Sequence, residues 1–381
     1  MTSVDEDIDR LADALTASGD LTDQKWRRSM HAVPRHLFIP ERGYAMPNSY
    51  RQGPPAHTID RNTDPEGWWA AVYSNMSVIT QRDDGAGDPA SAEGSASSSN
   101  SAPGVVFPFL ELLAPIEGER ILDIGTGTGW TAALLSDRVG SENVTTVEID
   151  PQMAAQAAEN IRAAGYAPNL ITGDGVAGWP QGTPYDGIHV TCGVSEVPLE
   201  WVRQLRPGGR AVLPWMSGTS GFKLRLIATR DGHAVGTFHG GAGYMMLRSQ
   251  RPISGWHKHH VDDAQLTTTR LDPAQVMEAE AGADLALTMN VPRLVMLRMF
   301  NTDGAKSCFL AEVDDPKGSW ATCDSSPTGE HIVTQYGDRR LWDEVEAAFT
   351  QWTQLGSPTP DRFTLTVGPD GQHLRLDNPA R

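Results

Sequence analysis

The chain has few cysteines. Cys192, Cys308 and Cys323 are the only three among 381 residues, and no two of them stand at a short spacing. Disulfide frameworks are dense in cysteine and zinc ribbons have cysteines in closely spaced pairs, so this pattern argues against both. We expect the three thiols to lie in the core.

Long hydrophobic runs are also missing. The longest apolar stretches, such as the one at residues 211–215, are far shorter than the roughly 18 residues of a membrane-spanning helix. Residues 1–20 are acidic and amphipathic, with no basic segment leading into an apolar run, which is unlike a secretory signal. These observations predict a cytoplasmic protein with no membrane partner.

Positive charge is scarce. Lysine and arginine total 31 against 48 aspartates and glutamates, giving a net charge of −17. Such a chain repels phosphate backbones, and no block of interleaved basic and aromatic residues offsets the charge, so we expect no nucleic-acid partner. The acidic surface either keeps the protein soluble or favours a basic peptide partner, and both interpretations stay open.

The chain does contain a regular alternation of strand and helix between residues 105 and 250. This order predicts an α/β fold with a doubly wound, mostly parallel, Rossmann-like sheet. After an opening helix at 105–113, the expected strands are 120–124, 144–149, 169–172, 187–191 and 210–214, and the expected helices are 130–139, 151–164 and 198–204.

The flanking regions have other patterns. Before the alternating region we expect helix, irregular chain and a short strand; after it we expect strands, a helix and a hairpin in a smaller α+β domain. The expected segments are helix at 5–40, irregular chain at 41–66, strand at 71–80, strands at 293–300, 306–313 and 330–336, helix at 341–355 and a hairpin at 363–376. The expected domain boundaries are therefore 1–80, 81–104, 105–250 and 251–381.

A glycine-rich turn follows the first strand of the alternating region. In ILDIGTGTGW, glycines at 125, 127 and 129 let the backbone approach a ligand at the carboxyl edge of the sheet. A dinucleotide fingerprint needs a further glycine where Trp130 stands, which disfavours a nicotinamide cofactor.

Three acidic residues accompany this turn. Glu148, at the end of the second strand, could accept hydrogen bonds from both hydroxyls of a ribose. Asp174, between two glycines, could bond the amine of adenine, and Asp123 could meet the amino group of a methionyl moiety. Their order and spacing predict S-adenosyl-L-methionine as the cofactor.

The surrounding segments carry a resemblance to a known family. Between about residues 20 and 250, the chain is similar to protein-L-isoaspartate O-methyltransferases, in the segments VPRHLFIP, VYSNMSVIT, VTTVEIDPQMAAQAAENIRAAGYAPNLITGDGVAGWP, TPYDGIHVTCGVSEVP and LRPGGRAVLPW. The resemblance implies a class I methyltransferase fold and transfer of a methyl group to a carboxylate of a protein or peptide.

That family has a Thr-Ile-Ser-Gln/Ala-Pro motif before the helix that leads to the first strand, and its serine is the active-site hydroxyl. Ser99-Asn100-Ser101-Ala102-Pro103 stands at this place. The resemblance implies that Ser101 is the catalytic residue and that residues 81–104 form an active-site loop. Composition alone is typical of a flexible linker, so a disordered segment stays the alternative.

Three departures from the family lie near the expected substrate channel. The loop at 83–98 is longer and more polar, Ser74-Asn75 stands where the family has an acidic residue, and GYMMLR around Tyr244 replaces Phe-Val-Pro-Leu. We expect substrate contacts from Asn75, Ser98 and Tyr244. The expected cofactor contacts are Ser99, Asn100, Asp123, Gly125, Thr126, Gly127, Gly129, Glu148, Ile149, Asp174 and Gly175.

The chain continues to residue 381, where the repair enzyme would stop. Its ending resembles methyltransferases associated with ribosomal peptide natural products, the lanthipeptides and graspetides. That resemblance implies esterification of a normal aspartate in a cyclised precursor peptide, followed by collapse of the ester to an aspartimide. The alternatives are isoaspartyl repair of damaged proteins and a non-catalytic peptide-binding module.

A histidine-rich segment, Trp256-His257-Lys258-His259-His260, is the one metal candidate. No carboxylate or cysteine stands at ligand spacing on a recognisable helix, so we predict no metal site. The sequence does not indicate an oligomeric state.

Overall fold

The computed structural model describes residues 3–48, 54–251, 263–301, 304–313, 315 and 318–377. The chain divides into two compact units. The first consists of Met1–Cys192, Pro198–Leu213 and Arg225–Ala234, and the second of Gly193–Val197, Pro214–Leu224 and Val235–Arg381. The boundaries expected at residues 80 and 104 lie inside the first unit, and the boundary expected at residue 250 lies inside the second unit.

The first unit opens with two helices, α1 (Val4–Ser18) and α2 (Gln24–Ala32). Ser3 and Glu6 form a capping box at the start of α1, and Gly19 ends it with φ = +81°. The side chain of Asp23 caps α2. The helical prediction for this region is therefore confirmed, with a break at residues 19–23 and a final 3-10 turn, η1 (Arg35–Phe38).

A small antiparallel sheet follows, with strand order β2-β1-β3-β4. It contains β1 (Arg42–Pro47), β2 (His57–Asp60), β3 (Met76–Arg82) and β4 (Ala96–Asn100), with helix α3 (Pro65–Val72) between β2 and β3. The irregular chain expected at 41–66 is wrong, because β1 pairs with both β2 and the later β3. The strand expected at 71–80 begins only at Met76.

Strand β4 lies inside the serine-rich segment whose composition is typical of a linker. It pairs with β3, for example through Val78 and Asn100. Backbone hydrogen bonds make this pairing, and they need no apolar alternation in the sequence. The segment is therefore ordered, as an active-site loop requires.

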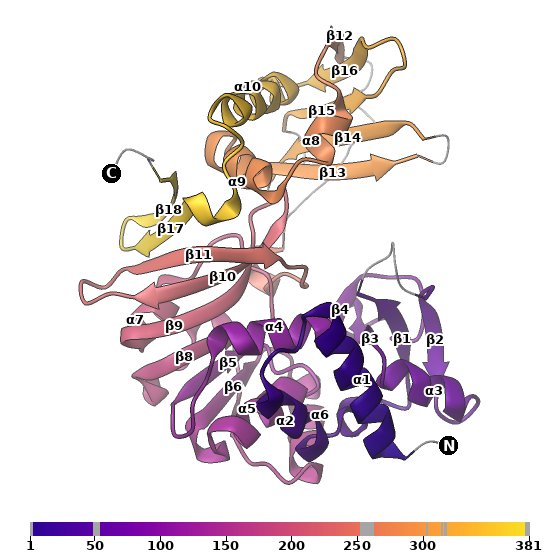
Figure 1. The fold of residues 1–381 in the computed structure, drawn as a ribbon, viewed down its shortest axis with the longest axis vertical. Helices are drawn as coiled ribbons and strands as arrows, with labels where there is room; N and C mark the ends of the chain where they lie inside the picture. Colours follow the sequence, from indigo (N-terminus) through magenta and orange to yellow (C-terminus); the bar gives the residue numbers. More distant parts are fainter. Residues whose placement is uncertain are drawn as a thin grey trace. The chain divides into compact units, whose positions relative to one another are not determined.

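The parallel sheet of the first unit confirms the doubly wound prediction, with strand order β9-β8-β5-β6-β7 (Figure 1). Neighbouring strands pair in parallel, and the order reverses between β5 and β8. The strands are β5 (Ile121–Ile124), β6 (Val144–Glu148), β7 (Asn169–Thr172), β8 (Tyr185–Val190) and β9 (Leu205–Met216), and the helices are α4 (Pro103–Leu113), α5 (Trp130–Val139), α6 (Pro151–Ala163) and α7 (Leu199–Gln204).

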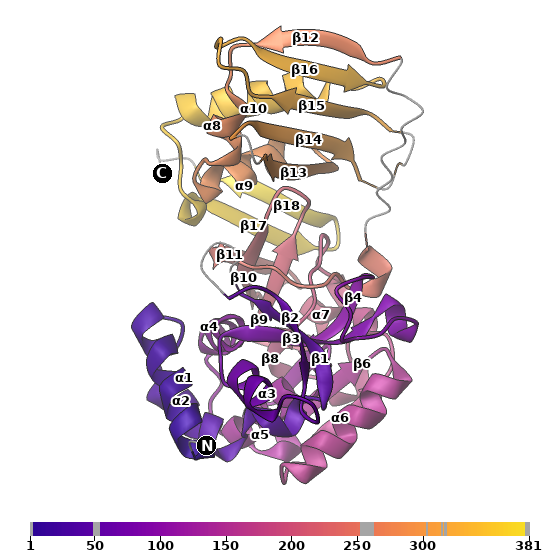
Figure 2. The same ribbon diagram turned by 90° about the vertical axis from the view of Figure 1, so that its right-hand side faces the viewer.

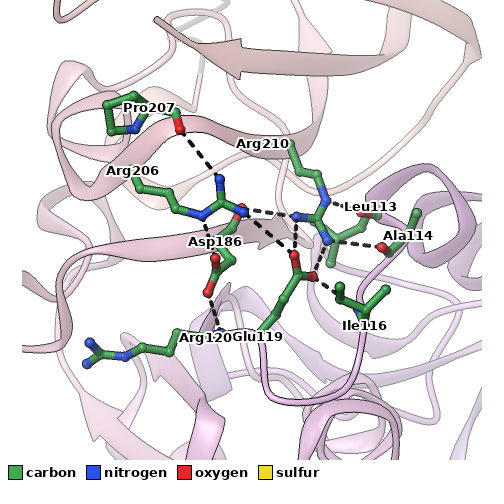
Figure 3. Close-up of polar contacts among 9 residues, drawn as sticks. All are labelled: Leu113, Ala114, Ile116, Glu119, Arg120, Asp186, Arg206, Pro207 and Arg210. Atoms are coloured by element: carbon green, nitrogen blue, oxygen red, sulfur yellow. Dashed lines mark hydrogen bonds and ion pairs between the residues drawn. The ribbon is translucent and has the colours of Figure 1, made fainter. Parts of the chain in front are cut away.

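A polar network fixes the end of α4 to this sheet (Figure 3). The nearly buried guanidinium of Arg210 on β9 donates to the backbone carbonyls of Leu113 and Ala114 and to the carboxylate of Glu119. Burial raises the pKa of Glu119, but the hydrogen bonds from Arg210 and from the N–H of Ile116, together with the charge of Arg210, lower it overall. Because α4 starts at Pro103, two residues after Ser101, this network anchors the far end of the helix that follows the motif.

The second unit contains two groups of strands. One has the order β18-β17-β11-β10, and the other is a five-stranded antiparallel sheet of order β12-β16-β15-β14-β13. Their bounds are β10 (Gly221–Ala228), β11 (Ala234–Gly241), β12 (Gln265–Thr269), β13 (Leu294–Phe300), β14 (Lys306–Glu312), β15 (Trp320–Asp324), β16 (His331–Tyr336), β17 (Phe363–Gly368) and β18 (Gly371–Leu376). Strands β10 and β11 have their remaining residues in the first unit.

Helices cover one face of the five-stranded sheet (Figure 2). They are α8 (Pro273–Met277), α9 (Ala281–Asn290) and α10 (Leu341–Gln354). The strands expected near residues 293, 306 and 330, the helix expected near 341 and the final hairpin are confirmed, whereas β10, β11, β12, β15, α8 and α9 were not predicted. Cys308 and Cys323 are buried free thiols, as expected, and Cys192 is half-buried.

None of the helices that the structure describes is long and apolar enough to cross a membrane.

Candidate active site

The glycine-rich turn after β5 has the backbone that its glycines predict. Gly125, Gly127 and Gly129 have φ values of +92°, +54° and +91°. A Cβ atom on Gly125 would stand 2.5 Å from the hydroxyl of Thr191, and one on Gly129 would stand 2.7 Å from the side chain of Ile161. Conformation and close packing therefore both require glycine at these two positions.

Glu148 ends β6 directly beside this turn. One carboxylate oxygen accepts a hydrogen bond from the backbone N–H of Gly127 at 2.8 Å, and the other accepts one from the backbone N–H of Asp150 at 3.0 Å. The next side chain, Ile149, is 39% exposed although it is apolar. A carboxylate and an open apolar surface therefore stand side by side at the carboxyl edge of the sheet.

Asp174 and Gly175 follow β7 at the same edge. Asp174 is exposed, and its carboxylate accepts a hydrogen bond from the N–H of Val176 at 3.0 Å. Gly175 is buried so closely that a Cβ atom on it would lie 2.6 Å from the side chain of Ile124 on β5. Gly175 therefore packs against the strand that carries the glycine turn, and Asp174 directly precedes Gly175 in the chain.

Asp123 has a different environment from the expected one. Its side chain is fully buried: one oxygen lies 2.8 Å from Nδ1 of His189, and the other accepts a hydrogen bond from Thr146 at 2.8 Å. The hydroxyl of Thr146 also lies 2.6 Å from that of Thr126. Because both carboxylate oxygens are used inside the sheet, the expected contact of Asp123 with a methionyl amino group is corrected to a role in holding the glycine turn.

The motif strand lies against the glycine turn. The backbone carbonyl of Ser99 is 3.5 Å from the place where a Cβ of Gly127 would stand, and the hydroxyl of Ser98 is 3.8 Å from it. Ser101 follows β4 and is half-buried. Within the described residues, its hydroxyl has no hydrogen-bonding partner, so it is available to a substrate placed beside the turn.

The side chains of two asparagines that we expected to contact cofactor or substrate form hydrogen bonds within the protein instead. The side chain of Asn100 is 2% exposed and hydrogen bonds to Arg35 and Thr128. The side-chain oxygen of Asn75 accepts a hydrogen bond from the N–H of Gly104 at 2.8 Å, in the first turn of α4. Asn100 as a cofactor ligand and Asn75 as a substrate ligand are therefore corrected to residues that fix the segment around Ser101.

Arg35 is a site residue that the sequence did not reveal. Its guanidinium is buried and donates to the carbonyls of Val72 and Met76 at 2.8 and 2.7 Å, and to that of Ser101 at 3.1 Å. Burial lowers the pKa of Arg35 to about 9, which leaves the side chain cationic at neutral pH. An arginine inside the apolar segment VPRHLFIP was the available signal, but its partners are scattered over residues 72–101.

The remaining candidates fall elsewhere. Tyr244 belongs to the second unit, in the segment after β11, and is half-exposed. The cluster Trp256-His257-Lys258-His259-His260 lies outside the described residues. Within the residues that the structure describes, no group of three or more His, Cys, Asp or Glu side chains could hold a metal ion.

Known proteins resemble this chain in sequence and in fold. The family Protein-L-isoaspartate(D-aspartate) O-methyltransferase (PCMT) matches residues 86–251. The chain is 40% identical over 159 residues to the protein-L-isoaspartate O-methyltransferase of Thermococcus onnurineus, which covers 41% of this chain and 70% of the relative. It is 31% identical over 243 residues to the protein-L-isoaspartate O-methyltransferase of Methanopyrus kandleri, and this alignment covers 63% of this chain and 90% of the relative.

A solved structure named protein-L-isoaspartate O-methyltransferase has a similar fold, with a TM-score of 0.53 at 21% identity, covering 97% of this chain and 100% of that chain. The similarity in fold thus extends beyond residue 251. The likeness in sequence covers most of the length of both relatives. The chain therefore belongs to the protein-L-isoaspartate O-methyltransferase family and is an S-adenosyl-L-methionine-dependent protein carboxyl methyltransferase.

Proposed function

We propose that this enzyme methylates the free carboxylate of isoaspartyl residues in proteins or peptides. The observation that carries the proposal is the position of the motif strand: Ser101, with an available hydroxyl, follows a strand that is hydrogen-bonded to the glycine turn through Asn100 and Thr128 at 2.9 Å. Family membership supports the same substrate class.

The residues at the carboxyl edge of the sheet fit the adenosyl donor, which supplies an activated methyl group when bound. Glu148 would hold the ribose hydroxyls, Ile149 would pack against the adenine, and Asp174 would accept from the adenine amine. The backbone of the glycine turn would lie against the methionyl portion.

The protein residues need only position the acceptor. A carboxylate has a pKa of about 4, so it is ionised at neutral pH and needs no general base. The Ser101 hydroxyl would donate a hydrogen bond to one carboxylate oxygen and direct the other toward the methyl group. Orientation of this kind is worth on the order of 7–11 kcal/mol in favourable systems.

The methyl ester makes a further reaction possible. Esterification removes the negative charge on the carboxyl group and turns its oxygen into part of a leaving group. The backbone nitrogen of the following residue then attacks the ester carbon, loses its proton and expels methanol, which closes a succinimide. Hydrolysis of this ring returns an aspartyl or isoaspartyl residue.

A second candidate is esterification of a normal aspartate in a ribosomally made, cyclised precursor peptide, with the ring persisting as an aspartimide. One observation favours it: Asn75 stands where the family has an acidic residue, and its side chain is used to hold the first turn of α4 beside Ser101. The substrate side of the site thus differs from the family pattern.

The test compares three peptides, a linear isoaspartyl peptide, its aspartyl counterpart and a cyclised form of the aspartyl peptide, with transfer of a labelled methyl group as the measurement. Preferential labelling of the isoaspartyl peptide is the expected result. Labelling only of a cyclised aspartyl peptide, with gain of one methyl group followed by loss of water relative to substrate, would establish the second candidate.

Ser101→Ala separates both from a non-catalytic binding module. We expect this variant to lose about 100-fold in kcat, because the acceptor carboxylate loses its orientation. Binding of S-adenosylhomocysteine should remain unchanged. A Ser101→Ala variant with the wild-type rate would remove the proposed role of this residue.

A further inference from the structure

Asn100 is a buried polar residue where the family motif has isoleucine. Its side chain is 2% exposed, and an amide in such a place is costly unless both of its ends are hydrogen-bonded. Both ends are: the oxygen accepts from Nε of Arg35 at 2.8 Å, and the nitrogen donates to the hydroxyl of Thr128 at 2.9 Å. Asparagine at this place therefore makes two contacts that isoleucine could not make.

The direction of these hydrogen bonds follows from the chemistry of the partners. A guanidinium only donates, so the amide oxygen must face Arg35. The amide nitrogen then faces Thr128, whose hydroxyl must accept. The hydrogen bonds Arg35–Asn100–Thr128 therefore have a single arrangement, in which Arg35 donates to Asn100 and Asn100 donates to Thr128. We call these two hydrogen bonds the link.

Each end of the link is anchored independently. Arg35 also donates to the carbonyls of Met76 and Ser101 at 2.7 and 3.1 Å, so it ties the start of β3 to the residue after β4. Thr128 lies between two glycines of the turn, and its carbonyl accepts from the side chain of Asn160 on α6 at 3.0 Å. One end of the link therefore holds the motif segment, and the other holds the cofactor turn.

We propose that Asn100 is a positioning residue that sets the distance between the Ser101 hydroxyl and the cofactor turn. This inference rests on the proposed role of Ser101 in orienting the acceptor carboxylate. Without the link, the glycine turn and Glu148 keep their own contacts, and Ser101 keeps its place after β4. The two halves form, but their separation is no longer fixed.

The test uses two substitutions at Thr128 that differ in one group. Thr128→Val keeps the shape of the side chain and removes the hydroxyl, whereas Thr128→Ser keeps the hydroxyl. We expect Thr128→Val to lower kcat about 10- to 100-fold, because displacements near 1 Å cost rates of this size. Thr128→Ser should restore most of the rate, and the Kd for S-adenosylhomocysteine should change less than about threefold in both.

Asn100→Ile, which installs the family residue, extends the test. We expect it to lower kcat to a similar degree, and the double variant with Thr128→Val to be no slower than Asn100→Ile alone, since both remove one interaction. Ser136→Ala is the matched control: it deletes another buried hydroxyl in the first unit, which donates to the carbonyl of Ala132, and should leave kcat unchanged.

Several results would overturn the proposal. The first is a wild-type kcat in Thr128→Val. The second is a double variant in which the effects of Thr128→Val and Asn100→Ile on kcat multiply. The third is loss of S-adenosylhomocysteine binding in Thr128→Val, which would mean that Thr128 contacts the cofactor itself. The rates are measured on whichever carboxyl peptide the wild type methylates. If the wild type methylates a peptide other than the isoaspartyl one, the proposed substrate is wrong but the comparison of variants still holds. The role of Ser101 is tested separately by the rate of Ser101→Ala.

Discussion

Nδ1 of His189 lies 2.8 Å from a carboxylate oxygen of Asp123, and both side chains are closed to solvent, with exposed fractions of 1% and 0%. The pair joins β8 to β5 at the point where the strand order reverses. Thr146 and Thr126 extend it to the glycine turn through hydrogen bonds of 2.8 and 2.6 Å. The carboxylate at this position is thus part of the scaffold under the cofactor turn.

This arrangement predicts that Asp123→Asn destabilises the protein even without cofactor. The new amide nitrogen donates instead of accepting, so either His189 loses its acceptor or the Thr146 hydroxyl must give up its present donation to residue 123. Such a loss costs about 1–3 kcal/mol of unfolding free energy. Urea unfolding of the cofactor-free protein measures it. Asp174→Asn is the control, because Asp174 is exposed and should change stability by less than about 0.5 kcal/mol. Equal, negligible effects in both variants would rule out the proposed scaffold role of Asp123.

The ion pair between Glu119 and Arg210 predicts a dependence of stability on pH (Figure 3). Burial, the largest single influence, raises the pKa of Glu119, but the hydrogen bonds from Arg210 and from the backbone N–H of Ile116, together with the charge of Arg210, lower it overall in the folded protein. A carboxyl with a lowered folded pKa contributes stability above its unfolded pKa, and that contribution disappears as the pH falls through the folded value. The relevant window therefore lies below 4.5, the ordinary pKa of a glutamate side chain.

Glu119→Gln tests this pair. We expect the variant to be about 1–3 kcal/mol less stable than the wild type at pH 7, because Arg210 keeps its carbonyl partners but loses its charged one. Below the folded pKa the two proteins should converge. Urea unfolding at pH 7 and in the acidic range measures the difference, and a constant gap at all pH values would show that shape rather than charge matters at residue 119.

The parallel half of the fold was predictable because its signals are local. Each strand is short and contains apolar or β-branched residues, the turn after the first of them contains three glycines, and Pro151 stands at the first turn of α6 after the capping Asp150. The same locality places Glu148 and Asp174 after strand ends and Ser101 in the motif, while their roles toward cofactor and substrate stay predictions.

The small sheet and the contacts around the motif could not be predicted in this way. Strand β4 consists of serines, an alanine and an asparagine, and only its pairing with β3 makes it a strand. Arg35 and Asn100 are far apart in the sequence, so the sequence around either residue does not show that the two side chains are hydrogen-bonded to each other. Asp123 was assigned to the ligand because its burial depends on His189 and Thr146, which belong to two other strands.

The glycine turn offers a last prediction, in which two equivalent substitutions differ in effect. Alanine at 127 would have φ near +54° and its nearest neighbour at 3.5 Å, an ordinary contact. Alanine at 129 would have φ near +91° and a carbon of Ile161 at 2.7 Å, which must shift. The left-handed backbone costs about 1–2 kcal/mol in both, and overpacking adds about 1–3 kcal/mol at 129 alone.

Gly129→Ala should therefore be clearly less stable in urea unfolding than Gly127→Ala. The clash with Ile161 also predicts coupling: Gly129→Ala should cost less in an Ile161→Ala background, because the smaller side chain makes room for the new methyl group. Gly127→Ala has no contact with Ile161 and should cost the same in both backgrounds. Strict additivity for Gly129→Ala and Ile161→Ala would mean that backbone conformation alone requires glycine at 129.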